Sequence, residues 1–393
     1  MHDKSLHILI IASWYPKMND LSGIFVKEQA EMLFRNGYKV TVLHPYLKGT
    51  FYNSLKTRKS ELNISDEDGI QVIRIAVSPF MPFFKSFSYL KLVKQVEHSF
   101  DFFFSGENIP DIIHSHALFM GGVVAYKLSK KHNIPFVHTE HTSGLVFNPE
   151  SYSYIDIALL KKVYSFAQKV IFVSEFVKNK LTENYNQVNQ NFVVIHNVVH
   201  SSFFTALLES ETQDPLRFII ICNLFPVKDL DLLIDSWKLF VSQFPQAKLT
   251  IAGDGPLKNK LKDKVVFLNI EDSVIWLNTL SRIEVINQID LHDVLLSTSK
   301  IETFGMTVAE AIGRGKPVVS TNSGGVIDII THETGLIVDR HPEAFSKGMA
   351  FMKMNYQNFQ PSHLQKYAYN KFSETRIYSQ LHNLYSSILK NEK

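Results

Sequence analysis

The sequence predicts an α/β fold of two doubly wound domains facing each other across a cleft. Short apolar runs alternate with amphipathic stretches along the chain, the pattern of parallel sheets that helices cover on both faces. The 393 residues, 45% of them hydrophobic, are enough to bury two sizeable cores. A polar, turn-prone segment at 209–215, ESETQDP, interrupts the apolar pattern, and we interpret it as the linker.

The first half of the chain contains seven apolar runs that we predict as strands. Apolar residues at helical spacing lie between most of these runs. The pattern predicts a first domain over 1–208. The strands are expected at 7–13, 39–45, 70–77, 111–116, 135–141, 169–174 and 192–197.

The same alternation restarts after the linker and predicts a second domain over 209–370. Its strands are expected at 216–224, 247–253, 265–270, 273–278, 293–299, 316–321 and 334–339. The remainder, 371–393, has apolar residues at helical spacing with no strand after it, so we predict a closing helix.

The charge balance and the apolar content exclude several classes of protein. The chain carries 41 Lys and Arg against 38 Asp and Glu, a net charge of +3, so no nucleic-acid partner is expected. The single cysteine, Cys222, excludes an internal disulfide, and the first residues lack the pattern of a secretory signal. No apolar run is long enough to span a bilayer, so we expect a cytoplasmic protein.

Ligand-binding residues are expected at the carboxyl ends of the strands, and Gly23 lies after the first of them. Glycine allows close approach of the backbone, and the free N–H groups of a helix start suit a phosphate. An ordinary turn with a helix cap explains the same residues, so both interpretations stay open.

Four histidines lie in or just after predicted strands: His114, His116, His138 and His141. Histidine in such a place can hydrogen-bond a ligand or move a proton near neutral pH. A structural role is equally consistent with His114 and His116. A zinc site is not expected, because no carboxylate or cysteine completes a recognised ligand pattern.

Lys228 lies between the first strand of the second domain and the helix that begins near Asp229. Its ammonium could neutralise a diphosphate, although a solvated loop lysine is the plain alternative. The nearby AGDGP, at 252–256, is interpreted only as a tight turn after a strand.

The segment IETFGMTVAEAIGRGKPVVS, at 301–320, combines a loop, a helix start and two acids. The helix start at Gly305 to Thr307 directs free amides toward the cleft, where negative charge is favoured. Glu302 lies in the loop and Glu310 one to two turns into the helix. Glycosidases flank the scissile bond with two acids. Here the amides and Glu302 are better suited to bind sugar hydroxyls, and Glu310 is suited to bind a second polyol such as a ribose. Two unrelated acids are the alternative.

These segments together resemble a known family, the retaining nucleotide-sugar-dependent glycosyltransferases of the family 4 type (glycosyl transferases group 1), which include sucrose synthase and bacterial mannosyltransferases. The resemblance rests on SWYP…SGIFVKEQAEML, DIIHSH, TEHTS, VSEF, VIHNVV, NLFPVKDLDLLIDSW, AGDGP and KIETFGMTVAEAIGRGKPVVSTNSGGVIDIITHETGLIV. It implies the GT-B architecture, in which two Rossmann-like domains face each other and the closing helix returns to the first domain.

The resemblance also implies a role for each matching residue. Glu302, beside the backbone of the helix start, matches the first glutamate of the family's paired motif, which contacts the donor sugar, and Glu310 matches the second, which binds the ribose. Lys228 matches the lysine on the diphosphate. The implied catalytic residues are His141, Glu302 and Lys228, and the implied donor-binding residues are Gly23, Asn223, Lys228, Phe304, Gly305, Met306, Thr307 and Glu310.

The chain departs from the family pattern at several positions. Asn223 stands in CNL where relatives place an arginine in GRL, so one cation on the diphosphate is missing. Gly23 is a single glycine where many relatives carry two, and Asn278 replaces a common glycine near the base-binding loop. These departures leave the donor nucleotide open.

The reaction implied is transfer of a hexose or N-acetylhexosamine from a UDP- or GDP-sugar to a hydroxyl of a saccharide or lipid-linked saccharide, with retention of configuration. No cofactor and no metal is expected, and the leaving phosphate takes the acceptor proton. Synthesis of cell-surface polysaccharide or glycolipid is the expected setting. A degenerate sugar-nucleotide-binding partner subunit and a nucleotide-sugar epimerase of the same architecture are the alternatives.

The segment 78–104 is dense in phenylalanine and contains Lys85, Lys91 and Lys94. Such a surface could rest on the inner face of the plasma membrane and admit a lipid-linked acceptor. Phenylalanines at these spacings also build cores, so the structural alternative stays open.

Overall fold

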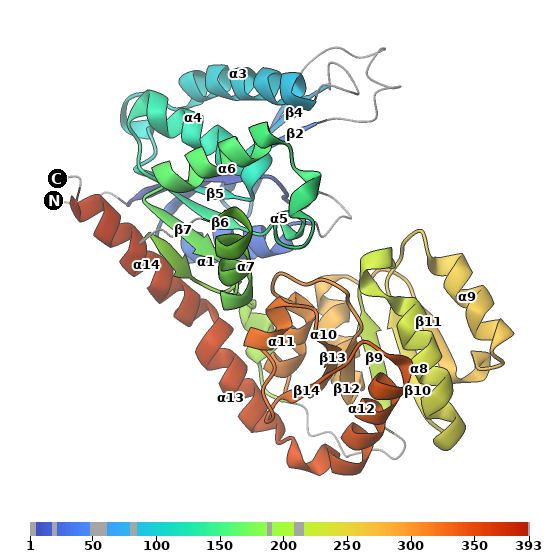
Figure 1. Ribbon diagram of the computed structural model, residues 1–393. Helices are drawn as coiled ribbons and strands as arrows, with labels where there is room; N and C mark the ends of the chain where they lie inside the picture. The colour runs from blue at the N-terminus through green and yellow to red at the C-terminus, as the bar shows by residue number, and fades with distance from the viewer. Residues whose placement is uncertain are drawn as a thin grey trace. The chain divides into compact units, whose positions relative to one another are not determined.

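The computed structural model describes residues 5–17, 22–47, 61–78, 85–186, 191–207 and 216–391 and divides the chain into two compact units (Figure 1). The first unit comprises 1–173, 178–198 and 378–393, and the second comprises 174–177 and 199–377. The main part of the second unit therefore begins at Val199, earlier than the end of the predicted first domain. The predicted linker, 209–215, lies outside the described residues.

The first unit contains an eight-stranded sheet in the order β3-β4-β2-β1-β5-β6-β7-β8. All neighbouring pairs are parallel except β3 and β4. The central strand β1 is buried along its whole length, as expected for a parallel sheet covered on both faces. The strands are β1 His7–Ala12, β2 Lys39–Leu47, β3 Glu61–Glu67, β4 Ile70–Val77, β5 Ile112–His116, β6 Phe136–Glu140, β7 Lys169–Phe172 and β8 Phe192–Val194.

Strand β3 is absent from the sequence prediction, because ELNISDE has no apolar run and most of its side chains are exposed. It pairs antiparallel with β4 at the edge of the sheet. The helices associated with this sheet are α1 Ile24–Arg35, α3 Lys85–Phe103, α4 Val123–His132, α5 Ser143–Phe147, α6 Tyr154–Phe166 and α7 Glu175–Tyr185.

The second unit contains a fully parallel six-stranded sheet in the order β11-β10-β9-β12-β13-β14. Its strands are β9 Arg217–Ile221, β10 Lys248–Ala252, β11 Val274–Leu277, β12 Val294–Ser297, β13 Val318–Thr321 and β14 Gly335–Val338. Its helices are α8 Leu230–Gln243, α9 Lys258–Phe267, α10 Arg282–Leu291, α11 Met306–Gly313, α12 Pro342–Asn355 and α13 Pro361–Phe372.

The strand predicted at 265–270 is wrong. Its first residues end helix α9, in which Leu261 and Val265 are buried four positions apart. The run VVFLNI is apolar and β-branched, but the helical spacing that starts before it determines the structure.

The closing helix, α14 Glu374–Asn391, belongs to the first unit from Tyr378 onward. Its Tyr385 hydroxyl lies 2.5 Å from Nδ1 of His114, and Nδ1 of His382 lies 2.8 Å from the Tyr38 hydroxyl. The last helix therefore completes the core of a domain whose other strands and helices all end by Val194.

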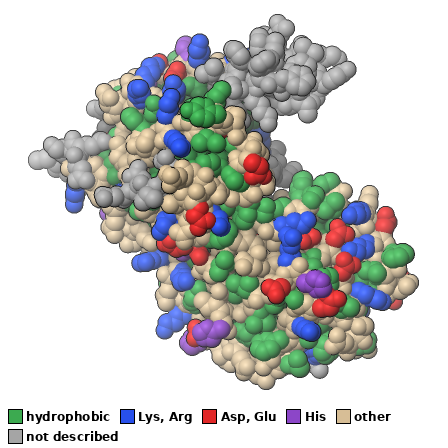
Figure 2. All heavy atoms as spheres, in the orientation of Figure 1, with side chains coloured by type: hydrophobic (Ala, Val, Ile, Leu, Met, Phe, Trp, Pro, Cys, Tyr) green, Lys and Arg blue, Asp and Glu red, His purple; other side chains and the backbone are tan. Residues whose placement is uncertain are grey.

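Helix α3 covers the strands β2 and β4 with part of the phenylalanine-rich segment 78–104. Leu92, Val96 and Phe100 are core residues, whereas Phe102 is exposed. Residues 79–84 and the side chain of Lys85 lie outside what the structure describes. None of the helices it describes combines the length and apolar composition needed to cross a bilayer. On the face shown in Figure 2, acidic and basic side chains lie interspersed, with apolar side chains between them.

Candidate active site

In the second unit the sheet order reverses between β9 and β12, and the loops that follow these two strands are joined to each other. The Thr298 hydroxyl donates to the carbonyl oxygen of Lys228 at 2.9 Å, and the Lys300 amide donates to the Val227 carbonyl at 2.8 Å. Open α/β sheets bind ligands at such a reversal, outside the carboxyl ends of the strands.

Glu302 is fixed in this position through both its backbone and its side chain. Its amide donates to the Ser323 carbonyl at 2.7 Å, and its own carbonyl accepts from the Gly325 amide at 2.8 Å. The carboxylate oxygen Oε1 accepts from Ser299 Oγ at 2.8 Å and from Lys228 Nζ at 2.5 Å.

The ammonium of Lys228 stays charged in this environment. Burial alone would lower the pKa of Lys228, but the Glu302 carboxylate and its hydrogen bond raise the pKa above its ordinary value. The two side chains are 25% and 19% exposed, so the pair is open to a ligand. Lys228 and Glu302, 74 residues apart in sequence, form one ion pair.

The glycines of AGDGP do more than turn the chain. A Cβ on Gly253 would lie 1.9 Å from the Cys222 carbonyl oxygen, and one on Gly255 would lie 2.7 Å from that of Leu224. This close approach lets the Leu224 amide donate to the Asp254 carbonyl at 2.8 Å, which holds the loop carrying Asn223. Asn223 itself is exposed.

Helix α11 begins directly after the loop that carries Glu302. Gly305 adopts φ +107°, a left-handed conformation that favours glycine, and Phe304 is buried against Phe372 with ring centroids 5.5 Å apart. Met306 and Thr307 form the first turn, where amides lack partners within the helix and carry its partial positive charge. The helix ends at Gly313, and Gly315 at φ +70° turns the chain toward β13, as the sequence predicts.

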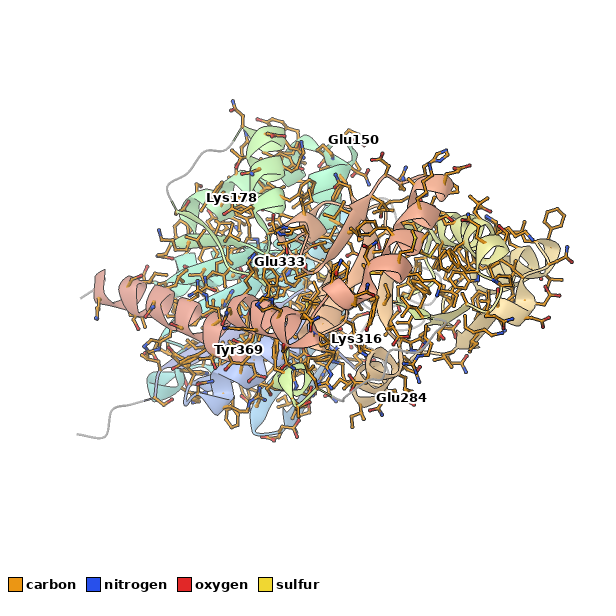
Figure 3. The ribbon with its side chains drawn as sticks, turned by 90° about the horizontal axis from the view of Figure 1, so that it is seen from below. Glu150, Lys178, Glu284, Lys316, Glu333 and Tyr369 are labelled. Carbon is orange, nitrogen blue, oxygen red and sulfur yellow. The ribbon has the colours of Figure 1, made fainter. Side chains whose placement is uncertain are left out.

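Glu310 is not part of the Lys228–Glu302 ion pair. It pairs instead with a residue that the sequence does not mark as a site residue. Its buried carboxylate lies 2.9 Å from Nη1 of Arg282, whose guanidinium lies 4.7 Å from the Phe203 ring centroid. Arg282 is the first residue of α10, which begins with a capping box formed by Ser281 and Glu284. Figure 3 labels Glu284 in the first turn of this helix. The pattern SRIE marks that helix start in the sequence, but nothing local indicates its contact with Glu310.

In the first unit the sheet order reverses between β1 and β5, and Gly23 lies in the loop after β1. Gly23 adopts φ +81°, and a Cβ there would lie 2.4 Å from the Trp14 carbonyl oxygen. The residue therefore starts α1 where only glycine fits. Phe25, two residues later, lies against His141 with ring centroids 4.6 Å apart, so the Gly23 loop and His141 come together.

The loop after β5 is also strained. Ala117 adopts φ +60°, and a π-helical turn, Leu118–Gly122, follows it. Ser13 ties this loop to the end of β1, because its hydroxyl donates to the His116 carbonyl at 3.0 Å and accepts from the Gly121 amide at 2.9 Å. Strained residues and π-turns are concentrated at functional sites.

His114, His116 and His141 form a buried histidine column at the ends of β5 and β6. His114 and His116 are stacked with ring centroids 4.4 Å apart, and Nδ1 of His116 lies 3.0 Å from Nε2 of His141. Burial, and then the neighbouring imidazoles, lower the pKa of His114 to about 3 and the pKa values of His116 and His141 well below the ordinary value. The column is therefore uncharged at neutral pH.

Glu140 supports the turn that carries His141. Its buried carboxylate accepts from the amides of His141 and Thr142 and from the Tyr164 hydroxyl, and it lies 3.1 Å from Nε2 of His138. Burial alone would raise the pKa of Glu140, but its hydrogen bond and electrostatic interaction with His138 and its hydrogen bonds with Thr142 lower the pKa to about 2. His138 thus belongs to the support of the turn. No group of three or more potential ligands for a metal ion occurs among the residues described.

Comparison with known proteins gives two family matches. Residues 209–371 match the family Glycosyl transferases group 1, and residues 22–203 match Glycosyltransferase Family 4. Among curated relatives, the alpha-monoglucosyldiacylglycerol synthase of Streptococcus pneumoniae is 25% identical over 272 residues. That alignment covers 64% of this chain and 59% of the relative, so the chain matches little more than half of the relative's length.

Solved structures share the fold over nearly the whole chain. A sucrose-phosphate synthase from Thermosynechococcus elongatus superposes with a TM-score of 0.79 at 17% identity, covering 98% of this chain and 100% of the other. The Anabaena protein HepE, solved in complex with UDP-glucose, superposes with a TM-score of 0.70 at 19% identity, covering 97% and 100%. The two sheets, their connections and the two family matches agree, and the chain belongs to the family 4-type glycosyltransferases with the GT-B architecture.

Proposed function

We propose that this glycosyltransferase moves a hexose or N-acetylhexosamine from a nucleoside diphosphate sugar to an acceptor hydroxyl with retention of configuration. The observation that carries the proposal is the Lys228–Glu302 ion pair beside the start of α11. It puts a cation, a carboxylate and free helix amides into one small region at the sheet reversal. These are the groups needed to bind a diphosphate and an adjoining sugar.

The diphosphate is the leaving group, so negative charge increases on it as the bond between the sugar carbon and the phosphate oxygen breaks. Lys228 and the amides of Met306 and Thr307 would stabilise that charge in the transition state. They supply the positive charge that a metal ion supplies in other transferases, and we propose that no metal is required.

Glu302 would hold hydroxyls of the donor sugar once the ligand draws Lys228 toward the phosphates. Ser299 continues to donate to the carboxylate in that arrangement. Glu310 is assigned to the ribose hydroxyls, with Arg282 holding its carboxylate in place. The same-face route implied by the family has the leaving phosphate oxygen accept the proton of the attacking hydroxyl.

We propose a saccharide or lipid-linked saccharide as the acceptor. The Streptococcus pneumoniae relative is named for a glycolipid product, and HepE was solved with UDP-glucose. These names support a UDP-sugar as the first donor to test and a glycolipid as the first acceptor. Peripheral contact with the inner face of the plasma membrane through 78–104, with Lys91 and Lys94 toward anionic lipid, is part of this proposal.

Release of nucleoside diphosphate from a panel of UDP- and GDP-sugars, with extracted membrane lipids as acceptors, tests the proposal. We expect release that depends on acceptor, survives a metal chelator and is lost in Glu302→Ala. Donor binding without turnover on any acceptor would instead support a sugar-nucleotide-binding partner subunit, for which the missing arginine at Asn223 is the motivation. Interconversion of the donor sugar without acceptor would indicate an epimerase.

A further inference from the structure

One buried amide, Gln29, is placed to determine which nitrogen of His141 carries its hydrogen. Gln29 lies on α1 and is 7% exposed. Its Nε2 is 3.3 Å from Nε2 of His116, and Nδ1 of His116 is 3.0 Å from Nε2 of His141. An amide and two imidazoles therefore form a continuous line of hydrogen bonds.

Each neutral imidazole has one N–H group and one bare nitrogen. A hydrogen bond made by one nitrogen therefore fixes the role of the other. The rings of the histidine column are buried together, and no ion pair joins them to a carboxylate within the described part of the chain, so this rule applies to every ring of the line.

The direction of the line follows from the amide. An NH₂ group only donates, so the Nε2 of His116 that faces Gln29 must be bare. The hydrogen of His116 is then on Nδ1, and it is donated to Nε2 of His141. Since that nitrogen accepts, the hydrogen of His141 is on Nδ1.

The other end of the histidine column does not compete for the amide. The Gln29 NH₂ group has two hydrogens, and Nδ1 of His114, 3.3 Å from it, has a closer partner in the Tyr385 hydroxyl at 2.5 Å. Nε2 of His114 lies 2.7 Å from the Thr139 hydroxyl. Tyr385 and Thr139 thus satisfy His114, and the amide of Gln29 is left for His116.

We propose that Gln29 is a positioning residue that holds His141 in the Nδ1–H tautomer, so that His141 meets the sugar donor as a hydrogen-bond donor and not as a base. Within the described residues Nδ1 of His141 has no hydrogen-bond partner, and the residue keeps 8% of its surface exposed. An N–H group there selects oxygen acceptors such as sugar hydroxyls or phosphate oxygens. The catalytic consequence rests on the proposed function, whereas the tautomer does not.

The tautomer can be observed directly in the full-length protein labelled with ¹⁵N-histidine. Long-range ¹H–¹⁵N correlation spectra separate the protonated from the bare nitrogen of a neutral imidazole, and the signals of His141 are assigned by their loss in His141→Gln. We expect the wild-type protein to show His141 protonated on Nδ1 and bare on Nε2. A hydrogen on Nε2 would overturn the proposal, because it requires the opposite orientation of the Gln29 amide.

Two variants locate the origin of the effect. Gln29→Met keeps the volume and removes the donor, so the nitrogens of His116 and His141 should shift to values averaged over both tautomers. Tyr385→Phe is the matched control and should change the signals of His114 alone. A pure Nδ1–H signal for His141 in Gln29→Met would overturn the role of Gln29, and the wild-type spectrum alone decides the tautomer if that variant does not fold.

Activity separates this inference from the proposed function. With a turning-over donor, Gln29→Met should lower kcat roughly two- to tenfold, because only part of the population then has the required tautomer. An inactive wild-type protein with the Nδ1–H tautomer would contradict the proposed function and leave this inference intact. An active protein with the Nε2–H tautomer would support the proposed function and contradict this inference.

Discussion

Replacing Lys228 by methionine separates the role of this lysine in transfer from its role in the fold. The ammonium lies 2.5 Å from Oε1 of Glu302, with the two side chains 25% and 19% exposed. Water screens a pair exposed to this extent, so its loss should lower the free energy of unfolding by only about 1 kcal/mol. Ser299 still donates to the carboxylate, so Glu302 keeps a partner.

The expected effect of Lys228→Met on transfer is much larger. If the ammonium stabilises the leaving diphosphate, its removal costs about 3 to 4 kcal/mol of transition-state stabilisation. That corresponds to roughly a 100- to 1,000-fold loss in kcat/KM. The measurements are nucleoside diphosphate release for kcat/KM and urea unfolding for stability.

The matched control is Lys260→Met. Lys260 lies on α9, is 66% exposed and pairs with Asp231 at 3.2 Å. Its loss should change stability by less than about 0.5 kcal/mol and leave turnover unchanged. A folded Lys228→Met protein with kcat/KM within about threefold of the wild type would refute the role of the ammonium in transfer.

Three further outcomes follow from the geometry. Gly23→Ala should lower the free energy of unfolding by more than about 1 kcal/mol, because it combines a left-handed φ with a contact of 2.4 Å to Trp14; an unchanged urea midpoint would contradict this. Glu310→Leu should lower the free energy of unfolding by about 2 kcal/mol, because the Arg282 guanidinium loses the carboxylate it pairs with. It should also weaken UDP binding, which calorimetry measures. A variant as stable as the wild type would show that the pair is dispensable for stability. The histidine column should make stability depend on pH: the pKa of His114 is about 3 in the folded protein and 6.5 when unfolded, so the unfolded chain binds more protons as pH falls below about 6.5. Each such histidine then contributes a fall of up to about 1.4 kcal/mol per pH unit. Between pH 6.5 and 5 the histidines cause this fall in stability. Glu140 does not contribute in that range, because the stability from its lowered pKa is lost only below about pH 4.5. If urea unfolding gives the same free energy of unfolding at pH 7, 6 and 5, this pH dependence is excluded.

Much of the fold was predictable because parallel strands are buried along their whole length. The run HILIIAS predicts β1 from composition alone, and KIETFG before MTVAEAIG predicts the loop and helix of α11. The edge strand β3 was not predictable, because its exposed residues carry no apolar signal and its pairing with β4 holds it in place. The apolar run at 265–270 predicts a strand, but in the structure its first residues form the end of helix α9.

The candidate site was predictable only where it lies in loops directly after strands. Lys228 and Glu302 were both expected at carboxyl ends, and the structure adds that they contact each other. The pairing of Glu310 with Arg282 had no local signal, because the two residues lie on different helices 28 positions apart. Phe25 likewise carries no local signal, because its contact with the His141 ring depends on the tertiary structure.

By itself the sequence determined the α/β class, the positions of most strands and the family, since all three depend on local patterns of apolar residues and on short motifs. Tertiary structure alone decided which polar groups meet. His114 reaches Tyr385 across 271 residues, and Gln29 reaches His116 across 87, because strand order places β1 beside β5 and the last helix returns to the first sheet. Hydrogen bonds act over about 3 Å, so their partners depend on register and topology, which local sequence does not specify.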